Sequence, residues 1–153
     1  MVRKYHRSDL DAIIELFHDT IHAINAQDYS REQLEAWAPA SVDVDSWHKQ
    51  LSSSLTYVAE DNGAIVGFGN LTSDGWVDML YIHKDHQREG IGTAILSKLI
   101  EDAGPLKFTA LRTEASTTAR PFFEARGFQL EKEQEKTYSG TLFRNSVMIK
   151  KLV

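Results

Sequence analysis

The segment that constrains the fold most runs from residue 76 to residue 103. Its first part, Trp76 to Ile82, is apolar enough to predict a buried strand, and a short polar turn separates that strand from an amphipathic helix. The turn ends in Gln87-Arg88-Glu89-Gly90-Ile91-Gly92. The first turn of a helix has unpaired N–H groups and a partial positive charge, and glycines remove the Cβ atoms that would keep a large anion away. The segment therefore predicts a backbone site for a diphosphate group.

Hydrophobic periodicity along the rest of the chain predicts one mixed α/β domain over residues 1–153. Helices come first, and a meander of strands follows. Ser30 and Gln33 form a capping-box pattern at the start of the second helix, and Asp43 or Asp45 is expected to cap the third. The expected helices cover residues 9–24, 30–37, 43–51, 90–103 and 116–126, and the expected strands cover residues 2–5, 55–60, 65–71, 76–82, 108–112, 128–136 and 143–150.

Composition excludes several functional classes. The formal net charge is −5 and there is no basic cluster, so we expect no nucleic-acid partner, whereas an acidic surface suits amine-bearing partners. The chain has no cysteine, which excludes disulfides, a thiol nucleophile and a thiolate metal site. No apolar run is long enough to predict a membrane span, and no signal peptide is visible. We therefore expect a cytoplasmic protein.

The residues offer two other kinds of site, a dinucleotide-binding motif and a metal site. Gly90 and Gly92 match the first glycines of a dinucleotide-binding motif, with Glu114 roughly where a ribose-binding acid is expected, but Ile95 occupies the third glycine position. His18 and His22 have a spacing that a metal site can use. However, Asp19 stands where the metalloprotease pattern has Glu, and no third ligand is evident. We expect no metal site, and a His-based metal hydrolase stays open as an alternative.

The glycine turn and its flanking strand and helix resemble motif A of the GNAT superfamily of acetyl-CoA-dependent N-acetyltransferases. A second stretch, from Ser116 to Phe128, resembles motif B of the same superfamily. The two motifs stand in the expected order with a predicted strand between them. The Ala-Arg-Pro-Phe-Phe-Glu run at 119–124 and the stretch at 33–39 are most similar to the YafP-like branch.

The resemblance implies an acyl-CoA N-acyltransferase fold, in which a mostly antiparallel sheet flanked by helices splays in the middle. Acetyl-CoA, the acetyl donor, would lie in the splay. Its pyrophosphate would contact the amides of Arg88 to Thr93, and its pantetheine arm would pair with the backbone of Leu80 to Ile82. The full set of expected cofactor-binding residues is Leu80, Tyr81, Ile82, Gln87, Arg88, Glu89, Gly90, Ile91, Gly92, Thr93, Ser116 and Phe123.

The implied reaction places few demands on side chains. A thioester is already activated, but an alkyl ammonium with a pKa of about 10.4 must lose a proton before it can attack. Asp78 is the candidate general base, and strand alternation places it on the same face as Leu80 and Ile82. A backbone N–H near Ile82 is the candidate for stabilising the oxyanion.

One position departs from the family pattern. Motif B often carries a tyrosine that protonates the departing thiolate, and this chain has Phe123 there. Water, Tyr138 or Tyr81 would have to supply that proton. The alternative is a non-catalytic module that binds or senses acyl-CoA. The acceptor is expected to be a primary amine of a small molecule or a peptide, selected by segments 20–50 and 136–144, and a homodimer stays open.

Overall fold

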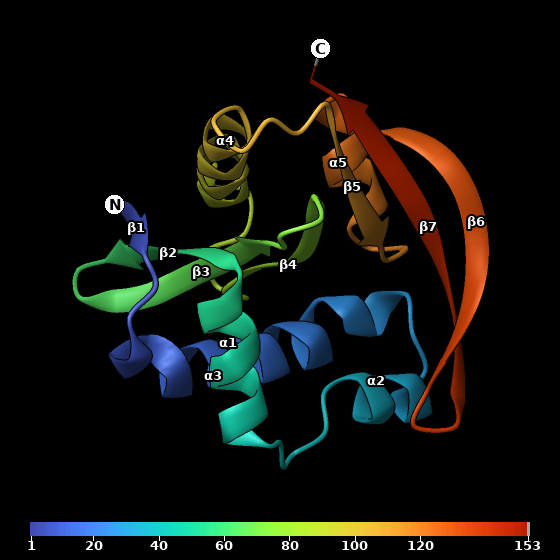
Figure 1. Cartoon of the computed structure of the whole chain (residues 1–153). Coiled ribbons are helices and arrows are strands. Elements are labelled where there is room, and N and C mark those ends of the chain that lie inside the picture. The colour runs from blue at the N-terminus through green and yellow to red at the C-terminus, as the bar shows by residue number, and fades with distance from the viewer. Residues whose placement is uncertain (153) are drawn as a thin grey trace.

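A seven-stranded sheet runs through the computed structural model, which describes residues 1–152 (Figure 1). The strands lie in the order β1-β2-β3-β4-β5-β7-β6. Neighbouring strands are antiparallel except β4 and β5, which are parallel. The bounds are β1 (Val2–Lys4), β2 (Leu55–Asp61), β3 (Ala64–Leu71), β4 (Trp76–Ile82), β5 (Ala110–Ala115), β6 (Gln129–Tyr138) and β7 (Thr141–Lys151).

Helices cover both faces of this sheet. The bounds are α1 (Leu10–Ala23), α2 (Arg31–Trp37), α3 (Val44–Ser53), α4 (Ile91–Ala103) and α5 (Arg120–Ala125). Figure 1 shows α1, α2 and α3 below the sheet and α4 above it. One apolar core, which includes Leu96, Leu99 and Leu111, fills the α4 side, and a second, which includes Ile13 and Phe68, fills the α1 side. The predicted mixed α/β sheet architecture is confirmed.

Several local predictions are confirmed by the hydrogen bonds. In the capping box, the Gln33 N–H donates to Ser30 Oγ at 3.1 Å and the Ser30 N–H donates to Gln33 Oε1 at 2.9 Å. Asp43 rather than Asp45 caps α3, because its carboxylate accepts from the Ser46 N–H at 3.2 Å. The strand predicted over residues 76–82 has those bounds. Among the described residues, no helix has the length and apolar character needed to cross a bilayer.

Two of the boundaries that differ from the predictions have an identifiable cause. β5 spans Ala110–Ala115 instead of residues 108–112, because its limits follow the ladder that it forms with β7. α5 begins at Arg120 instead of residue 116, because Ser116 Oγ accepts from the Ala119 N–H at 3.1 Å and holds the preceding residues in a turn. In both cases a specific hydrogen-bond partner determines the boundary.

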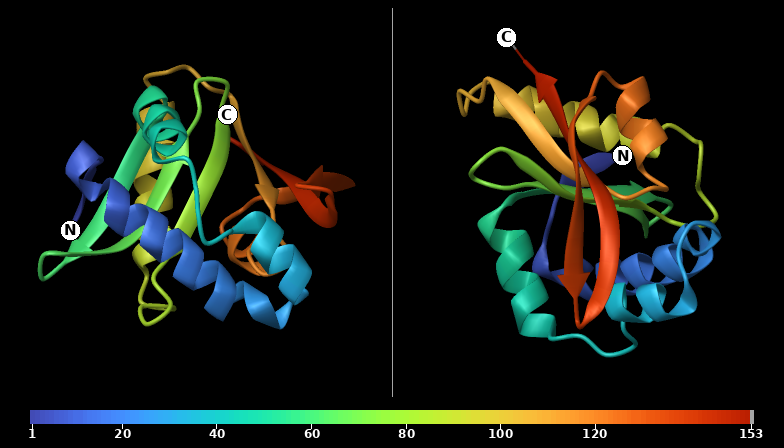
Figure 2. Two further views of the ribbon diagram at one scale, coloured as in Figure 1. Left: turned by 90° about the horizontal axis from the view of Figure 1, so that it is seen from below. Right: turned by 90° about the vertical axis from the view of Figure 1, so that its right-hand side faces the viewer.

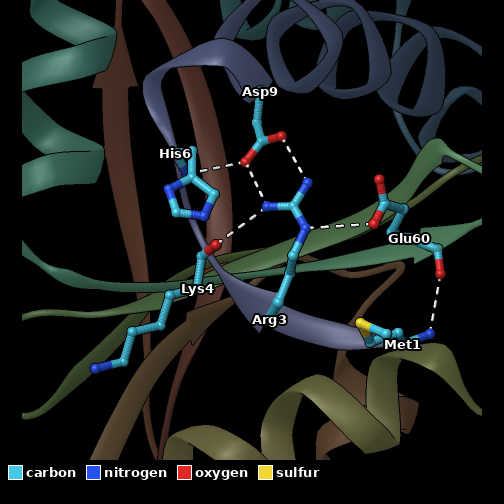
Figure 3. A network of polar contacts seen from close by, with 6 residues as sticks. All are labelled: Met1, Arg3, Lys4, His6, Asp9 and Glu60. Carbon is cyan, nitrogen blue, oxygen red and sulfur yellow. Dashed lines mark hydrogen bonds and ion pairs between the residues drawn. The ribbon is translucent and has the colours of Figure 1, made fainter.

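An ion-pair network fastens the start of α1 to the edge of the sheet (Figure 3). The Arg3 guanidinium on β1 donates to both carboxylate oxygens of Asp9 at 2.9 Å, and its Nε donates to Glu60 on β2 at 3.4 Å. The His6 N–H also donates to Asp9, at 2.9 Å. Burial disfavours the charge on Asp9, but the hydrogen bonds from Arg3 and His6 outweigh it and lower the pKa of Asp9.

We expect Asp9→Asn to lower the free energy of unfolding at pH 7 by about 1–3 kcal/mol, because it leaves Arg3 without its main partner. A lowered folded-state pKa stabilises the protein above the unfolded pKa of about 3.9 and loses that contribution as the pH falls. The difference between the variant and the original protein should therefore shrink below about pH 4, which urea denaturation across pH will measure.

The matched control is Glu35→Gln. Its partner, Arg31, is 90% exposed and Glu35 is 61% exposed, so the change should cost no more than about 0.5 kcal/mol. Equal losses for the two variants, or a loss in Asp9→Asn that does not depend on pH, would contradict the assigned role of the network.

Candidate functional site

The strands β4 and β5 separate in the middle of the sheet. They pair only at Trp76 with Arg112 and at Val77 with Thr113, and β4 then runs on beside β3 alone (Figure 1). The predicted splay is therefore present. Its position coincides with a β-bulge, since Leu71 pairs with Val77 and the next pair along β3 joins residues 70 and 79. The extra residue in β4 is Asp78, and such an insertion bends the strand and increases its twist.

Two buried side chains hold the strand in this shape. Asn70 is fully buried, and its Oδ1 accepts from the Met79 N–H at 2.8 Å while its Nδ2 donates to Ser54 Oγ at 3.0 Å. Thr113 Oγ1 donates to the Val77 carbonyl at 2.8 Å, just where the two strands part. Both backbone groups beside the bulge are thus satisfied by side chains, which lets the ladder break without orphaned polar groups.

The bulge changes the face on which Asp78 lies. Leu80 and Ile82 pack toward α4, whereas the Asp78 carboxylate accepts a hydrogen bond from Gln50 of α3, on the opposite face of the sheet. The prediction that Asp78 shares a face with Leu80 and Ile82 is therefore wrong. Simple alternation fails here because one inserted residue shifts the phase of every side chain that follows it.

Beyond the bulge, β4 presents backbone groups to the gap. The His83 N–H donates to Val66 of β3 at 2.8 Å. Since amides alternate in direction along a strand, the N–H groups of Leu80 and Ile82 point away from β3 and into the gap. The Ile82 carbonyl is occupied, because it accepts from Gln87 Nε2 at 2.7 Å and from Thr20 Oγ1 at 3.1 Å.

The two glycines before α4 have different roles. Gly90 is the N-cap with φ +81°, and a Cβ built there would meet nothing within 4 Å, so the backbone at the helix start is open to an approaching group. Arg88 is also left-handed, with φ +62°. At Gly92, by contrast, a Cβ would lie 3.0 Å from the Phe122 ring. Gly92 therefore allows α4 and α5 to pack closely, and Gly90 shapes the turn.

Two connected cavities occupy the splay. The narrow cavity, of about 190 Å³, lies between the β4 edge, the start of α4 and α5, and the wide cavity, of about 690 Å³, opens on the side of α2, α3 and the β6–β7 hairpin. Both are lined by Trp37, Val77, Asp78, Tyr81, Glu114 and Ser116, which we call the junction.

The predicted site residues fall into three groups. The narrow cavity is lined by Asp78, Leu80, Tyr81, Ile82, Gln87, Gly92, Ser116 and Phe123. The turn and helix start next to it hold Arg88, Glu89, Gly90, Ile91 and Thr93, where Glu89 bonds to His86 at 3.1 Å and Thr93 accepts from Arg126 at 2.8 Å. Tyr138 lines the wide cavity. Phe123 is buried with its ring edge-on to Phe122 and Phe128.

The two carboxylates at the junction, Glu114 and Asp78, have different hydrogen-bond partners. Lys136 of β6 donates to both oxygens of Glu114 at 2.7 and 2.8 Å, and this hydrogen bond raises the pKa of Lys136. The pair neutralises the β5 side of the gap. Asp78, which lines the wide cavity, instead accepts from the neutral Gln50 amide. Burial raises the pKa of Tyr81, which keeps its hydroxyl protonated.

Sequence reasoning missed Gln50 and Asn70, and it considered Glu114 only for a ribose. A polar residue inside the apolar run of β3 is a detectable signal for Asn70. Nothing in the sequence marks Gln50, which meets Asp78 from 28 positions away. The rings of His18 and His22 lie 4.3 Å apart, and His22 Nε2 bonds to the Ala38 carbonyl at 2.8 Å. Within residues 1–152 no three such side chains gather as a metal-binding group.

Comparison with known proteins identifies clear relatives. Residues 25–149 match the family model described as an acetyltransferase (GNAT) domain. The uncharacterized N-acetyltransferase YafP of Escherichia coli K12 is 33% identical over 147 residues, which cover 96% of this chain and 93% of that protein. The crystal structure of a GCN5-related N-acetyltransferase from Rhodopseudomonas palustris superposes with a TM-score of 0.96 at 34% identity, covering 99% of this chain and 95% of that one.

A more distant neighbour shares the fold alone. The PaiA N-acetyltransferase of Thermoplasma acidophilum, solved in complex with coenzyme A, has a TM-score of 0.81 at 19% identity, with 99% of this chain and 98% of that chain covered. The splayed sheet described above is therefore an architecture that a coenzyme A-binding protein also uses.

We expect Asn70→Ala to lower the free energy of unfolding by about 1–3 kcal/mol, because the Met79 N–H and the Ser54 hydroxyl both lose a buried partner. The Met79 amide should also exchange its hydrogen faster with solvent, which hydrogen-exchange measurement resolves. Gln129→Ala, an exposed amide on β6, is the control and should change neither quantity. Unchanged protection of Met79 in Asn70→Ala would show that Asn70 does not hold the bulge.

Proposed function

The chain belongs to the GNAT family of acetyltransferases, and from this membership we infer that it transfers an acetyl group from acetyl-CoA to a primary amine. The observation that carries the inference is the meeting of the two cavities at the bulge of β4. One cavity runs along free backbone groups toward a helix start, and the other opens toward solvent. A donor and an acceptor can thus approach the same carboxylate from opposite sides.

Acetyl-CoA would occupy the narrow cavity. Its diphosphate fits the start of α4, where Gly90 leaves the backbone uncovered and the helix contributes unpaired N–H groups. The pantetheine arm fits the gap beside Leu80 and Ile82, whose amides point into it. The donor supplies an acetyl group that is already activated as a thioester, and the Ile82 N–H is positioned to polarise its carbonyl.

Asp78 is the proposed general base. An amine in the wide cavity must lose a proton before its nitrogen can bond to the acetyl carbon, and the C–S bond then breaks to release free thiol. The Asp78 carboxylate lies at the junction, accepts from a neutral amide and faces α3 because of the bulge. It therefore stands on the side from which the amine enters, which is the geometry a base requires.

Tyr81 is the proposed proton donor to the departing thiolate. Phe123 lines the narrow cavity without a hydroxyl, and Tyr138 lines the wide one. Tyr81 is the tyrosine that lines both cavities, so it lies where the donor and the acceptor would meet. Tyr138, the other tyrosine considered for this role, serves as the comparison.

We expect Asp78→Asn to lower kcat/KM for the amine by about 10²- to 10⁴-fold, because an amide cannot accept the proton. Affinity for coenzyme A should stay unchanged by calorimetry, since the change leaves the narrow cavity's backbone groups in place. Thiol release is the measurement. Asp61→Asn, at the exposed end of β2, is the control and should keep full activity. Coenzyme A binding without thiol release from any amine would instead favour an acyl-CoA-binding module.

We expect Tyr81→Phe to lower kcat by about tenfold or more with little change in KM, since the hydroxyl acts after substrates bind. Adding Phe123→Tyr to this variant should restore part of the rate, because it places a hydroxyl in the narrow cavity. Tyr138→Phe should keep kcat. A larger loss in Tyr138→Phe than in Tyr81→Phe would move the acid role to the hairpin.

A further inference from the structure

We propose that the wide cavity selects small primary amines with an aromatic or branched apolar body and excludes extended polypeptides. The proposal rests on the proposed function, since it identifies the class of acceptor for the same reaction. Three features of the cavity carry it, and each comes from a different part of the chain. The first is a wall of aromatic rings. The second is a carboxylate without a cationic partner among the described residues on one side of the gap, and the third is a pair of hydrogen bonds that close one end of the wide cavity.

The aromatic wall is a connected array of rings from elements far apart in sequence. Phe17 of α1 packs edge-on to Trp47 of α3 at 4.8 Å and to Tyr81 of β4 at 5.0 Å between centroids. Trp37 of α2 packs edge-on to Phe143 of β7 at 6.1 Å. All of these residues line the wide cavity. Edge-to-face contacts fix ring orientations, so the wall is preorganised.

Part of this wall faces the cavity without a covering group. Trp37, Trp47 and Tyr81 are half-buried, although they sit among core residues. Apolar surface left in water costs about 25 cal/mol per Å², so a ligand that covers it gains affinity. A flat or branched hydrocarbon body is the group that achieves this, whereas a hydroxyl-rich or charged body does not.

The charges direct the amino group of such a ligand to the junction. Glu114 is paired with the cation of Lys136 on one side of the gap, whereas the donor to Asp78 on the other side is the neutral Gln50 amide. An ammonium is therefore drawn toward Asp78, and the faces of Trp37 and Tyr81, which also line the junction, attract a cation as well. The amine then lies at the reaction site and the apolar body lies along the wall.

Bridges across one end limit the length of the ligand. Gln33 Nε2 on α2 donates to the Leu142 carbonyl of the β6–β7 hairpin at 3.1 Å, and both views of Figure 2 place α2 beside that hairpin. The Thr117 N–H donates to the Tyr29 hydroxyl at 2.8 Å, which ties the loop before α2 to the loop after β5. An extended chain cannot cross these contacts, and a volume of about 690 Å³ suits a small molecule.

The experiment compares acceptors with the full chain at saturating acetyl-CoA and measures thiol release. The probes are ethylamine, isoamylamine, 2-phenylethylamine, ethanolamine and a short peptide whose N-terminal residue is phenylalanine. We expect kcat/KM for 2-phenylethylamine to exceed that for ethylamine by about tenfold or more, with isoamylamine between them, because each buried apolar group adds binding energy. The peptide should react more slowly than 2-phenylethylamine.

Variants test whether the wall causes the preference. Trp47→Leu should lower the ratio of the 2-phenylethylamine to the ethylamine kcat/KM by about fivefold or more, and Trp47→Phe should restore most of it. The ratio is insensitive to the fraction of folded enzyme, so a misfolded variant does not imitate the result. Phe108→Leu, a half-buried ring among the side chains of the α4 core and outside both cavities, is the control and should leave the ratio unchanged.

The outcomes separate the two proposals. No thiol release from any probe, together with no affinity for acetyl-CoA, would overturn the proposed function. Acetylation of ethylamine and ethanolamine as efficiently as 2-phenylethylamine would overturn the acceptor class and leave the function standing. A peptide that reacts as fast as 2-phenylethylamine would identify a polypeptide N-terminus as the acceptor and would also overturn the proposal.

Discussion

The site depends on one extra residue in one strand. The bulge at Asp78, held by the Asn70 side chain, ends the pairing of β4 with β5 after two residue pairs. Beyond the bulge, the outward amides of β4 are free of β5, and the two cavities lie along this part of the strand. The same insertion turns the carboxylate of Asp78 from the α4 side to the α3 side. The opening of the sheet, the free backbone edge and the placement of the proposed base therefore have a single physical cause.

The bulge matters because of what is packed around it. The hydrogen-bond donor to Asp78 is the neutral amide of Gln50, whereas the neighbouring carboxylate of Glu114 is paired with the cation of Lys136. If Lys136 were paired with Asp78 and Gln50 with Glu114, the proposed base would have a cationic partner and the uncompensated carboxylate would lie on β5. The ion pair on β5 and β6 thus compensates the charge of Glu114, and the carboxylate at the junction whose donor is neutral is the one proposed as the base.

The parts of the fold that rest on local sequence could be predicted, and the parts that rest on distant partners could not. The limits of β4, the Ser30 capping box and the glycine turn before α4 follow from neighbouring residues, and the structure has them as expected. The predicted face of Asp78 was wrong because strict alternation along a strand does not allow for an inserted residue. The predicted start of β5 was wrong because pairing with β7, which begins only at Thr141, sets the limits of the strand. No feature of the sequence indicates that Gln50 contacts Asp78. Asn70, by contrast, is an amide inside an apolar run and could have indicated the bulge.

Donor and acceptor are held by different kinds of group, and α1 connects them. The proposed donor cavity relies on main-chain amides of β4 and of the start of α4, where Gly90 and Gly92 keep the backbone accessible and closely packed. The acceptor cavity relies on the rings of Phe17, Trp37 and Trp47, which substitutions can change one at a time without breaking a ladder. α1 contributes Thr20 to the first and Phe17 to the second, and the Arg3–Asp9 pair fixes where that helix begins. A shift of α1 would therefore alter both cavities together, whereas a change at Trp47, which lines the wide cavity alone, would leave the lining of the narrow cavity in place.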